Sequence, residues 1–90
     1  MRTAEVEQMV AEWESAHAQA QRIESELIPL AAQRRDAAQA AYRGGTGPLS
    51  AVLDARRAEL DAELALITQR QAAAKAWTWL NFVTPAVEGS

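Results

Sequence analysis

The segment from Tyr42 to Leu49, with the sequence YRGGTGPL, interrupts a chain that otherwise has the composition of continuous helix. Three of the four glycines lie there, within four residues. Glycine adopts positive φ values without a steric penalty, so it suits the position just past a helix C-terminus. Proline suits the first position of a helix, where its missing N–H costs nothing. We therefore predict that one helix ends near Arg43, that residues 44–47 form a reversal, and that a second helix begins near Pro48.

The residues before the reversal have the periodicity of an amphipathic helix. Apolar residues recur at steps of three and four, and the larger members are Val6, Val10, Trp13, Ile23, Leu27 and Leu30. Pro29 lies inside this pattern, and its ring clashes with the carbonyl of Ser25 in a regular helix. Because the stripe resumes at Leu30 and Ala31, we predict a kink near residues 25–29 within one helix over about residues 3–43.

The residues after the reversal carry two apolar stripes. The first comprises Leu49, Leu53, Leu60, Leu64 and Ile67, extended by Ala74 and Trp77, and the second comprises Val52, Ala55, Ala62, Leu66, Ala73 and Leu80. A helix with two apolar stripes contacts neighbours on two sides, as in a bundle or a closed ring of helices. We expect Pro85 to end this helix, which gives a helix over about residues 48–82 and a frayed tail over residues 83–90. The predicted fold class is all-α: an antiparallel helical hairpin that self-associates into a four-helix bundle.

Composition and charge exclude several classes of function. The net charge of −3 provides no clustered positive surface for nucleic acid. The absence of cysteine excludes disulfides and thiolate metal sites. No run approaches the ~20 apolar residues of a membrane span, and the N-terminus lacks the pattern of a secretion signal. We therefore expect a soluble chain without a signal peptide.

Patterns for catalysis and metal binding are weak. The only histidine, His17, follows Met9 and Trp13 at helical spacing, and such a stripe usually packs against other helices. An alternative is a helical metal-binding protein centred on Met9 and His17, but a lone histidine leaves such a site incomplete. Four carboxylates of the second helix lie at helical spacing beside two arginines: Asp54, Glu59, Asp61 and Glu63. This spacing favours exposed ion pairs over a general acid–base couple, so we expect no enzyme activity and no cofactor.

The tip and the second helix resemble the outer membrane efflux protein (TolC) family. The segment YRGGTGPLSAVLDARR, residues 42–57, has a tyrosine three residues before a tip glycine and then Val-Leu-Asp-Ala. The preceding Ile28-Pro29-Leu30-Ala31 is similar to the long helix before the tip in that family. The closing AWTWLNF, residues 76–82, is similar to the heavy-metal efflux (CzcC/CusC-like) branch. The resemblance covers nearly the whole chain.

The resemblance implies a helical tunnel segment of a tripartite efflux channel. Family members are trimers with a β-barrel in the outer membrane of Gram-negative bacteria and a helical tunnel across the periplasm. The tip would dock a periplasmic adaptor, which links the channel to an inner-membrane pump. The residues that match this docking tip are Arg43, Gly44, Gly45, Thr46, Gly47, Pro48 and Leu49. Tyr42 and Asp54 match positions that close the aperture, whereas Gly47 and Ala51 stand where some members have a latch arginine and a further aspartate.

A stand-alone helical interaction or scaffold protein without a transport role is the alternative interpretation. The chain lacks the barrel strands and the other hairpin of the family, so we expect an excised or truncated piece that forms a homodimer by itself. Flanking DNA that encodes strand-patterned segments would favour the efflux interpretation. A free-standing gene would favour the scaffold.

Overall fold

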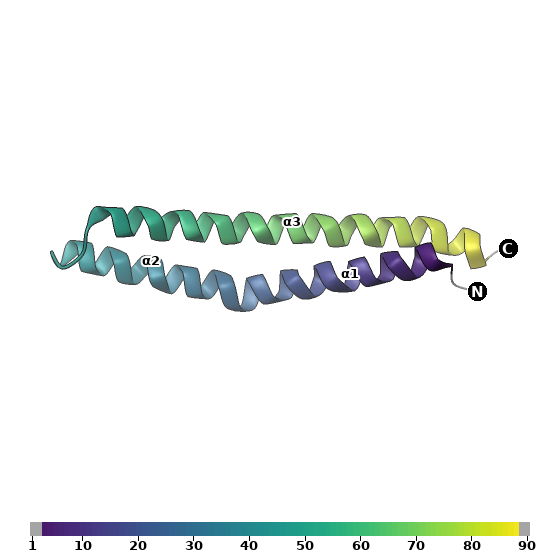
Figure 1. The fold of residues 1–90 in the computed structure, drawn as a ribbon, viewed down its shortest axis with the longest axis horizontal. Coiled ribbons are helices and arrows are strands. Elements are labelled where there is room, and N and C mark those ends of the chain that lie inside the picture. The colour runs from purple at the N-terminus through teal and green to yellow at the C-terminus, as the bar shows by residue number, and fades with distance from the viewer. Residues whose placement is uncertain (1–2, 89–90) are drawn as a thin grey trace.

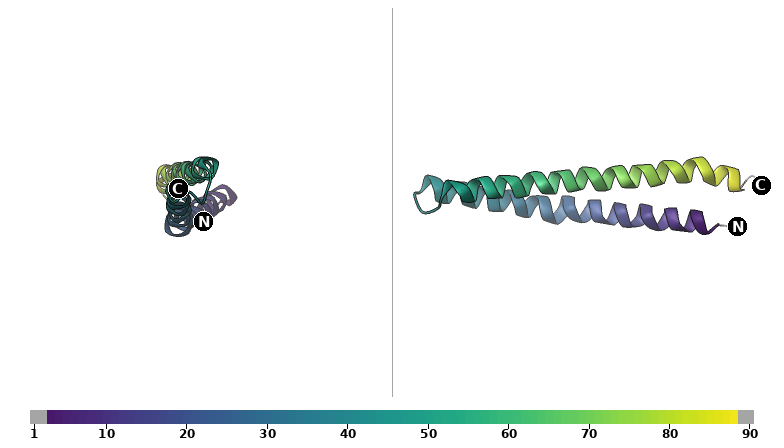
Figure 2. Two further views of the ribbon diagram at one scale, coloured as in Figure 1. Left: turned by 90° about the vertical axis from the view of Figure 1, so that its left-hand side faces the viewer. Right: turned by 45° about the horizontal axis from the view of Figure 1, so that its top comes forward.

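The computed structural model describes the backbone of residues 3–88 and the side chains of residues 3–82. These residues form helices and no strand: α1 (Ala4–Arg22), a π-helical turn η1 (Ile23–Leu27), α2 (Ile28–Arg43) and α3 (Leu49–Glu88). The predicted all-α class is therefore confirmed. The helices build a rod of 69 × 15 × 15 Å, in which α3 lies along α2 and then along α1 (Figure 1). Figure 2 shows α3 beside the other helices along the length of the rod.

The first arm, which consists of α1, η1 and α2, begins at a capped N-terminus. The Thr3 hydroxyl oxygen accepts a hydrogen bond from the N–H of Val6 at 3.2 Å, so one of the unpaired N–H groups of the first turn is satisfied. Glu5 and Glu7 place negative charge in the same turn, where the helix dipole favours it.

The π-helical turn lies immediately before Pro29. The N–H of Ile28 donates to the carbonyl of Ile23, five residues back. The wider turn accommodates the proline ring, which would clash with the Ser25 carbonyl in a regular α-helix. The Ser25 hydroxyl also donates to the carbonyl of Gln21 at 2.8 Å, a contact that bends helices. The first arm changes direction here (Figure 1), and both a π-bulge and a proline are known causes of such a bend.

The π-helical turn changes which residues of the first arm face α3. The seam passes from Ile23 to Ile28, a step of five instead of three or four, and continues at the buried Ala31. Leu27 and Leu30, which regular spacing assigns to the buried stripe, are 46% and 42% exposed. That part of the sequence prediction is wrong, because the π-helical turn inserts one residue into the repeat.

α3 buries one of its two apolar stripes and exposes the other. The second stripe is the inner seam: Leu66 forms the central core with Ala20 and Ile23. The other members of the inner seam are half-buried: Val52, Ala55, Ala62, Ala73 and Leu80. The first stripe remains uncovered, and we call its large members the outer stripe: Leu49, Leu53, Leu60, Leu64, Ile67 and Trp77, which are 49–60% exposed.

Both ends of α3 differ slightly from the prediction. The helix begins at Leu49, and the Pro48 carbonyl accepts from the N–H of Ala51 at 3.2 Å, so Pro48 precedes the first helical residue. The predicted end near Phe82 is wrong, because α3 continues through Pro85 to Glu88. A proline removes one backbone hydrogen bond and bends a helix, but neighbouring turns can continue it. The predicted tail therefore contains helix over residues 83–88, and residues 89–90 lie outside the described part.

Candidate functional site

The tip is a compact reversal held by backbone hydrogen bonds to the last turn of α2. The N–H of Gly45 donates to the Tyr42 carbonyl at 3.1 Å, and the N–H of Thr46 donates to the Ala41 carbonyl at 2.8 Å. With Gly45 at φ 76°, this is a Schellman motif, in which a left-handed residue closes the helix C-terminus. The N–H of Gly47 and the hydroxyl of Thr46 also donate to the Ala41 carbonyl, at 3.1 and 3.2 Å.

The three glycines of the tip have different roles. Gly45 supplies the left-handed conformation, which side chains rarely adopt. Gly47 allows a close approach, because a Cβ atom there would lie 2.9 Å from the Cβ of Ala41. Gly44 has an ordinary right-handed conformation, with φ −81° and ψ −2°. The observed geometry therefore requires glycine at Gly45 and Gly47 but not at Gly44.

The predicted docking residues all lie at one end of the rod (Figure 1). Six of them are exposed and Gly47 is half-buried. Leu49 is 49% exposed beside the reversal and begins the outer stripe. The tip therefore exposes backbone, the Arg43 side chain, one hydroxyl and one large apolar side chain.

The predicted gating residues lie on different arms near the tip. Tyr42 is in the last turn of α2 and is 48% exposed, and Asp54 is exposed in the second turn of α3. Within residues 3–82 no hydrogen bond joins these two side chains or joins either to Arg43.

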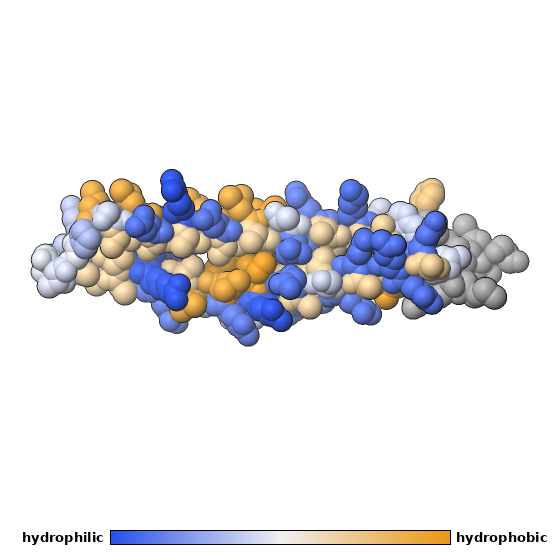
Figure 3. Space-filling view, in the orientation of Figure 1, coloured by the Kyte–Doolittle hydropathy of each residue, from blue (hydrophilic) through white to orange (hydrophobic). Residues whose placement is uncertain are grey.

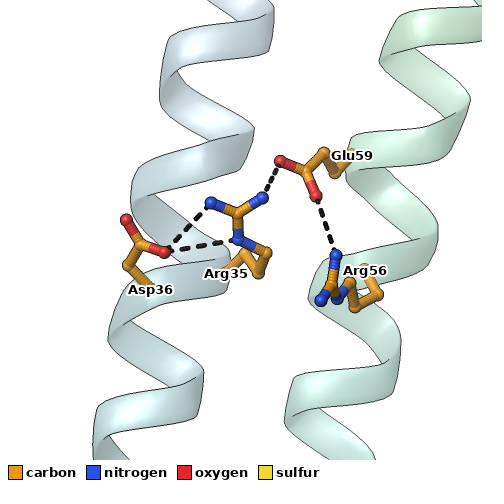
Figure 4. Close-up of polar contacts among 4 residues, drawn as sticks. All are labelled: Arg35, Asp36, Arg56 and Glu59. Carbon is orange, nitrogen blue, oxygen red and sulfur yellow. Dashed lines mark hydrogen bonds and ion pairs between the residues drawn. The ribbon is translucent and has the colours of Figure 1, made fainter.

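A polar cluster links the two arms two to three turns from the tip (Figure 4). The Arg35 Nη1 atom donates to the Glu59 carboxylate at 2.5 Å, and its Nη2 atom donates to Asp36 at 3.1 Å. Arg56 lies 3.8 Å from the other oxygen of Glu59. Glu59 is only 7% exposed, so its charge requires this pairing.

Electrostatics at the cluster keep Arg35 charged. The hydrogen bonds to Glu59 and then to Asp36 raise the pKa of the Arg35 guanidinium above its ordinary value. Because this pKa is raised, the stabilisation of the folded state by the charged Arg35 side chain is fully present at pH values below the unfolded-state pKa. The contribution of Arg35 is lost when the pH rises through the folded-state pKa, in strongly alkaline solution. The Arg35 guanidinium therefore remains charged across the physiological range.

Sequence reasoning assigned Glu59 to an exposed ion pair and missed its burial. The spacing in the sequence indicates this burial, because Glu59 lies seven residues from both Val52 and Leu66 and so falls on the inner seam. A second ion pair between the arms, Arg70 with Glu24, is exposed on both sides and adds little stability. Together the two pairs mark the alignment of the arms.

The surroundings of His17 contain no cluster of metal ligands within residues 3–82. The ring of His17 stacks on that of Trp13, with centroids 5.2 Å apart and an angle of 10° between planes. Its Nε2 atom lies 3.5 Å from the side-chain nitrogen of Gln21. Within residues 3–82 no three His, Cys, Asp or Glu side chains gather as metal ligands. The described neighbours of the His17 ring are thus the aromatic ring of Trp13 and the side-chain amide of Gln21.

The outer stripe is a row of exposed apolar side chains along α3. Apolar side chains follow the free edge of α3 in its half nearer the tip, among charged side chains (Figure 3). Single exposed apolar residues are ordinary, whereas a row of them along one helix makes this side of α3 a candidate interaction surface. Within residues 3–88 no helix has the length and apolarity required to cross a membrane.

Comparison with known proteins identifies no relative: no protein-family model matches this chain, and it has no significant match to a curated protein or a solved structure.

Proposed function

We propose that this chain is a segment of the periplasmic helical tunnel of a tripartite efflux channel in a Gram-negative outer membrane. In this role it is an antiparallel hairpin of a trimeric TolC-like protein. Its tip docks a periplasmic adaptor and contributes to the aperture, and the adaptor connects the channel to an inner-membrane pump. The observation that carries the proposal is that α3 has two apolar faces, of which the first arm covers only one.

The relative position of the two faces supports a wall of helices. The inner seam follows a seven-residue repeat through Val52, Glu59 and Leu66, and Leu53, Leu60 and Ile67 each lie one position later. One residue corresponds to about 100° around a helix. The outer stripe is therefore turned by more than a quarter of a circle from the inner seam. A helix with faces at this angle fits between two neighbours in a curved, closed wall.

The tip geometry supports a docking role. The hydrogen bonds to Ala41 fix the reversal, so little conformational freedom is lost when a partner binds. Gly44, Gly45 and Thr46 are exposed and small, and they allow another helix pair to approach the backbone closely. The residue spacing from Tyr42 through the tip to Asp54 is the part that resembles efflux channels.

Cysteine crosslinking in the full-length parent protein tests the docking role. The chain contains no cysteine, so a single Thr46→Cys substitution gives one reactive site at the tip. Arg57→Cys, exposed on α3 away from the tip, is the matched control. We expect a crosslink to a periplasmic adaptor from position 46 and not from position 57. Equal crosslinking from both positions, or none from the tip, contradicts adaptor docking.

The outer stripe gives a separate test with the isolated chain. Without the other helices of a tunnel, two copies cover their outer stripes by forming a four-helix bundle. Sedimentation at micromolar concentration is expected to show a dimer, and Leu60→Gln with Leu64→Gln is expected to give a monomer. Asp61→Ala with Thr68→Ala, on another exposed side of α3, serves as the control pair. A well-folded monomer of the unaltered chain would refute this association.

The two tests separate efflux from the alternative of a stand-alone interaction module. Both functions use the outer stripe, but only efflux requires a specific adaptor at the tip. Self-association without adaptor crosslinking favours the stand-alone module. The similarity of residues 76–82 to the heavy-metal branch further predicts that deletion of the parent gene lowers resistance to transition-metal ions.

A further inference from the structure

α2 contains two parallel series of residues, offset by one position. The series that faces α3 is buried or half-buried: Ile28, Ala31, Arg35 and Ala38. The series one residue earlier is exposed at every position: Leu27, Leu30, Arg34 and Ala37. Each series offers two apolar residues, an arginine and an alanine at the same spacing. The exposed series therefore has the composition of a second seam.

Continuation of the α1 repeat leads to the exposed series. In α1 the seam includes Ala20 and Ile23, and regular steps of four and three from Ile23 reach Leu27 and Leu30. The observed structure departs from this path only because the π-helical turn inserts one residue before Ile28. Without that insertion, α2 would present the Leu27 series to α3.

The ionic contact between the arms would survive such an exchange. Arg35 occupies the seam position opposite Glu59 and bonds to it. In a regular helix, Arg34 would occupy that position, so the buried carboxylate would still face a guanidinium. The pairing requirement of Glu59 therefore does not select between the two series.

The tip can also absorb a shift of one residue. Gly45 occupies the left-handed position that closes α2, and the preceding residue is Gly44, whose right-handed conformation does not require glycine. After the shift, Gly44 would take the left-handed position, which only glycine accepts freely. Two adjacent glycines therefore allow the helix end to close in either arrangement.

We propose that the first arm can pack against α3 in two registers and that Pro29, through the π-helical turn, selects the observed one. The exchange turns α2 by about 100°, the angle of one residue in an α-helix. It thereby redirects Tyr42 and Arg43 at the tip. A proline in a regular helix clashes with the carbonyl four residues back, and this clash disfavours the second register. The proposal does not depend on a role in efflux.

Thiol reactivity in the full 90-residue chain tests this proposal. Single Leu30→Cys and Ala31→Cys variants report the two registers, and Ala16→Cys, buried in α1, reports that the rod remains folded. With Pro29 present, we expect position 30 to react with a maleimide about tenfold faster than position 31, because burial protects the thiol. In a Pro29→Ala background we expect the order to reverse, with position 16 still protected.

Arginine substitutions give a second readout of the same exchange. With Pro29 present, Arg35→Gln is expected to lower Tm more than Arg34→Gln, because Arg35 bonds to Glu59. In the Pro29→Ala background this order is expected to reverse. An unchanged order in either experiment overturns the proposal. Equal fast labelling at positions 30 and 31 also overturns it, because α2 would then have lost its seam instead of exchanging it.

Discussion

Replacement of Gly45 by alanine tests whether its left-handed conformation fixes the tip. Gly45 has φ 76°, and no atom lies within 4 Å of a Cβ atom added there, so the backbone penalty is the whole steric effect. A left-handed alanine costs roughly 1–2 kcal/mol. Gly44→Ala is the matched control: its φ is −81°, and the added Cβ lies 3.3 Å from the Ala40 carbonyl oxygen. The two neighbouring substitutions are chemically identical. They differ in backbone conformation and in the 3.3 Å contact at position 44, which lowers the stability of the control and so works against the expected difference.

Thermal unfolding followed by far-UV circular dichroism measures the difference. Each 1 kcal/mol lost lowers Tm by about 4–8 °C in a domain of this size. Protein concentration is held constant, because association also raises Tm. Gly45→Ala should melt clearly below Gly44→Ala, and Gly45→Asn should recover part of the loss, since asparagine tolerates this conformation. If Gly45→Ala melts at or above Gly44→Ala, the closure of α2 does not depend on Gly45.

Three further changes probe the rod. Leu66→Ala should lower the free energy of unfolding by about 2 kcal/mol. Leu64→Ala, at a side chain 60% exposed, should lower it by less than about 1 kcal/mol in the monomer. Urea unfolding of the monomer compares the two variants, and equal losses would contradict the assignment of the inner seam. Gly47→Ala should be destabilising by about 1–3 kcal/mol through overpacking, and a double-mutant cycle with Ala41→Gly should show favourable coupling, since the clash is between their Cβ atoms. Glu59→Gln should lower the urea midpoint at neutral pH, because it weakens the bond between the arms, and an unchanged midpoint would mean that this bond contributes nothing to stability.

Local chemistry predicted the tip well. A cluster of glycines followed by Pro48 identified the reversal, because only glycine takes the left-handed position freely. The sequence left open whether Gly44 or Gly45 takes that position, and the hydrogen bonds to Ala41 and Tyr42 show that it is Gly45. Binding at the tip depends on the surface of the partner, so no pattern within this chain determines it.

The errors arose where one residue changes a repeat or a charge lies on an apolar face. Regular spacing placed Leu27 in the seam, but the π-helical turn passes that position to Ile28. Pro29 indicated a bend without indicating how the backbone would accommodate it. Glu59 was placed on the surface from its charge, although its spacing from Leu66 puts it on the inner seam. Periodicity was the better guide at Glu59, and it failed at Leu27 because the π-helical turn inserts one residue into the repeat.

Few large apolar side chains are buried between the helices of this long rod. Within residues 3–82, seven apolar side chains are buried, and four of them are alanines: Val6, Ala16, Ala20, Ile23, Ala31, Leu66 and Ala76. Alanine allows two helices to approach closely, but each contributes little, since stabilisation follows the apolar area removed from water at about 25 cal/mol per Å². Glu59 further replaces an apolar residue in the seam.

The outer stripe holds the larger reserve of apolar surface. Its six large side chains are about half exposed, and burial of the remainder would contribute roughly 1 kcal/mol for each. Covering the outer stripe would therefore add substantially to the stability of α3. Stability that rises steeply with protein concentration in the unaltered chain, and that stops rising after Leu60→Gln and Leu64→Gln, would show that the helix pair is built as one component of a larger helical assembly.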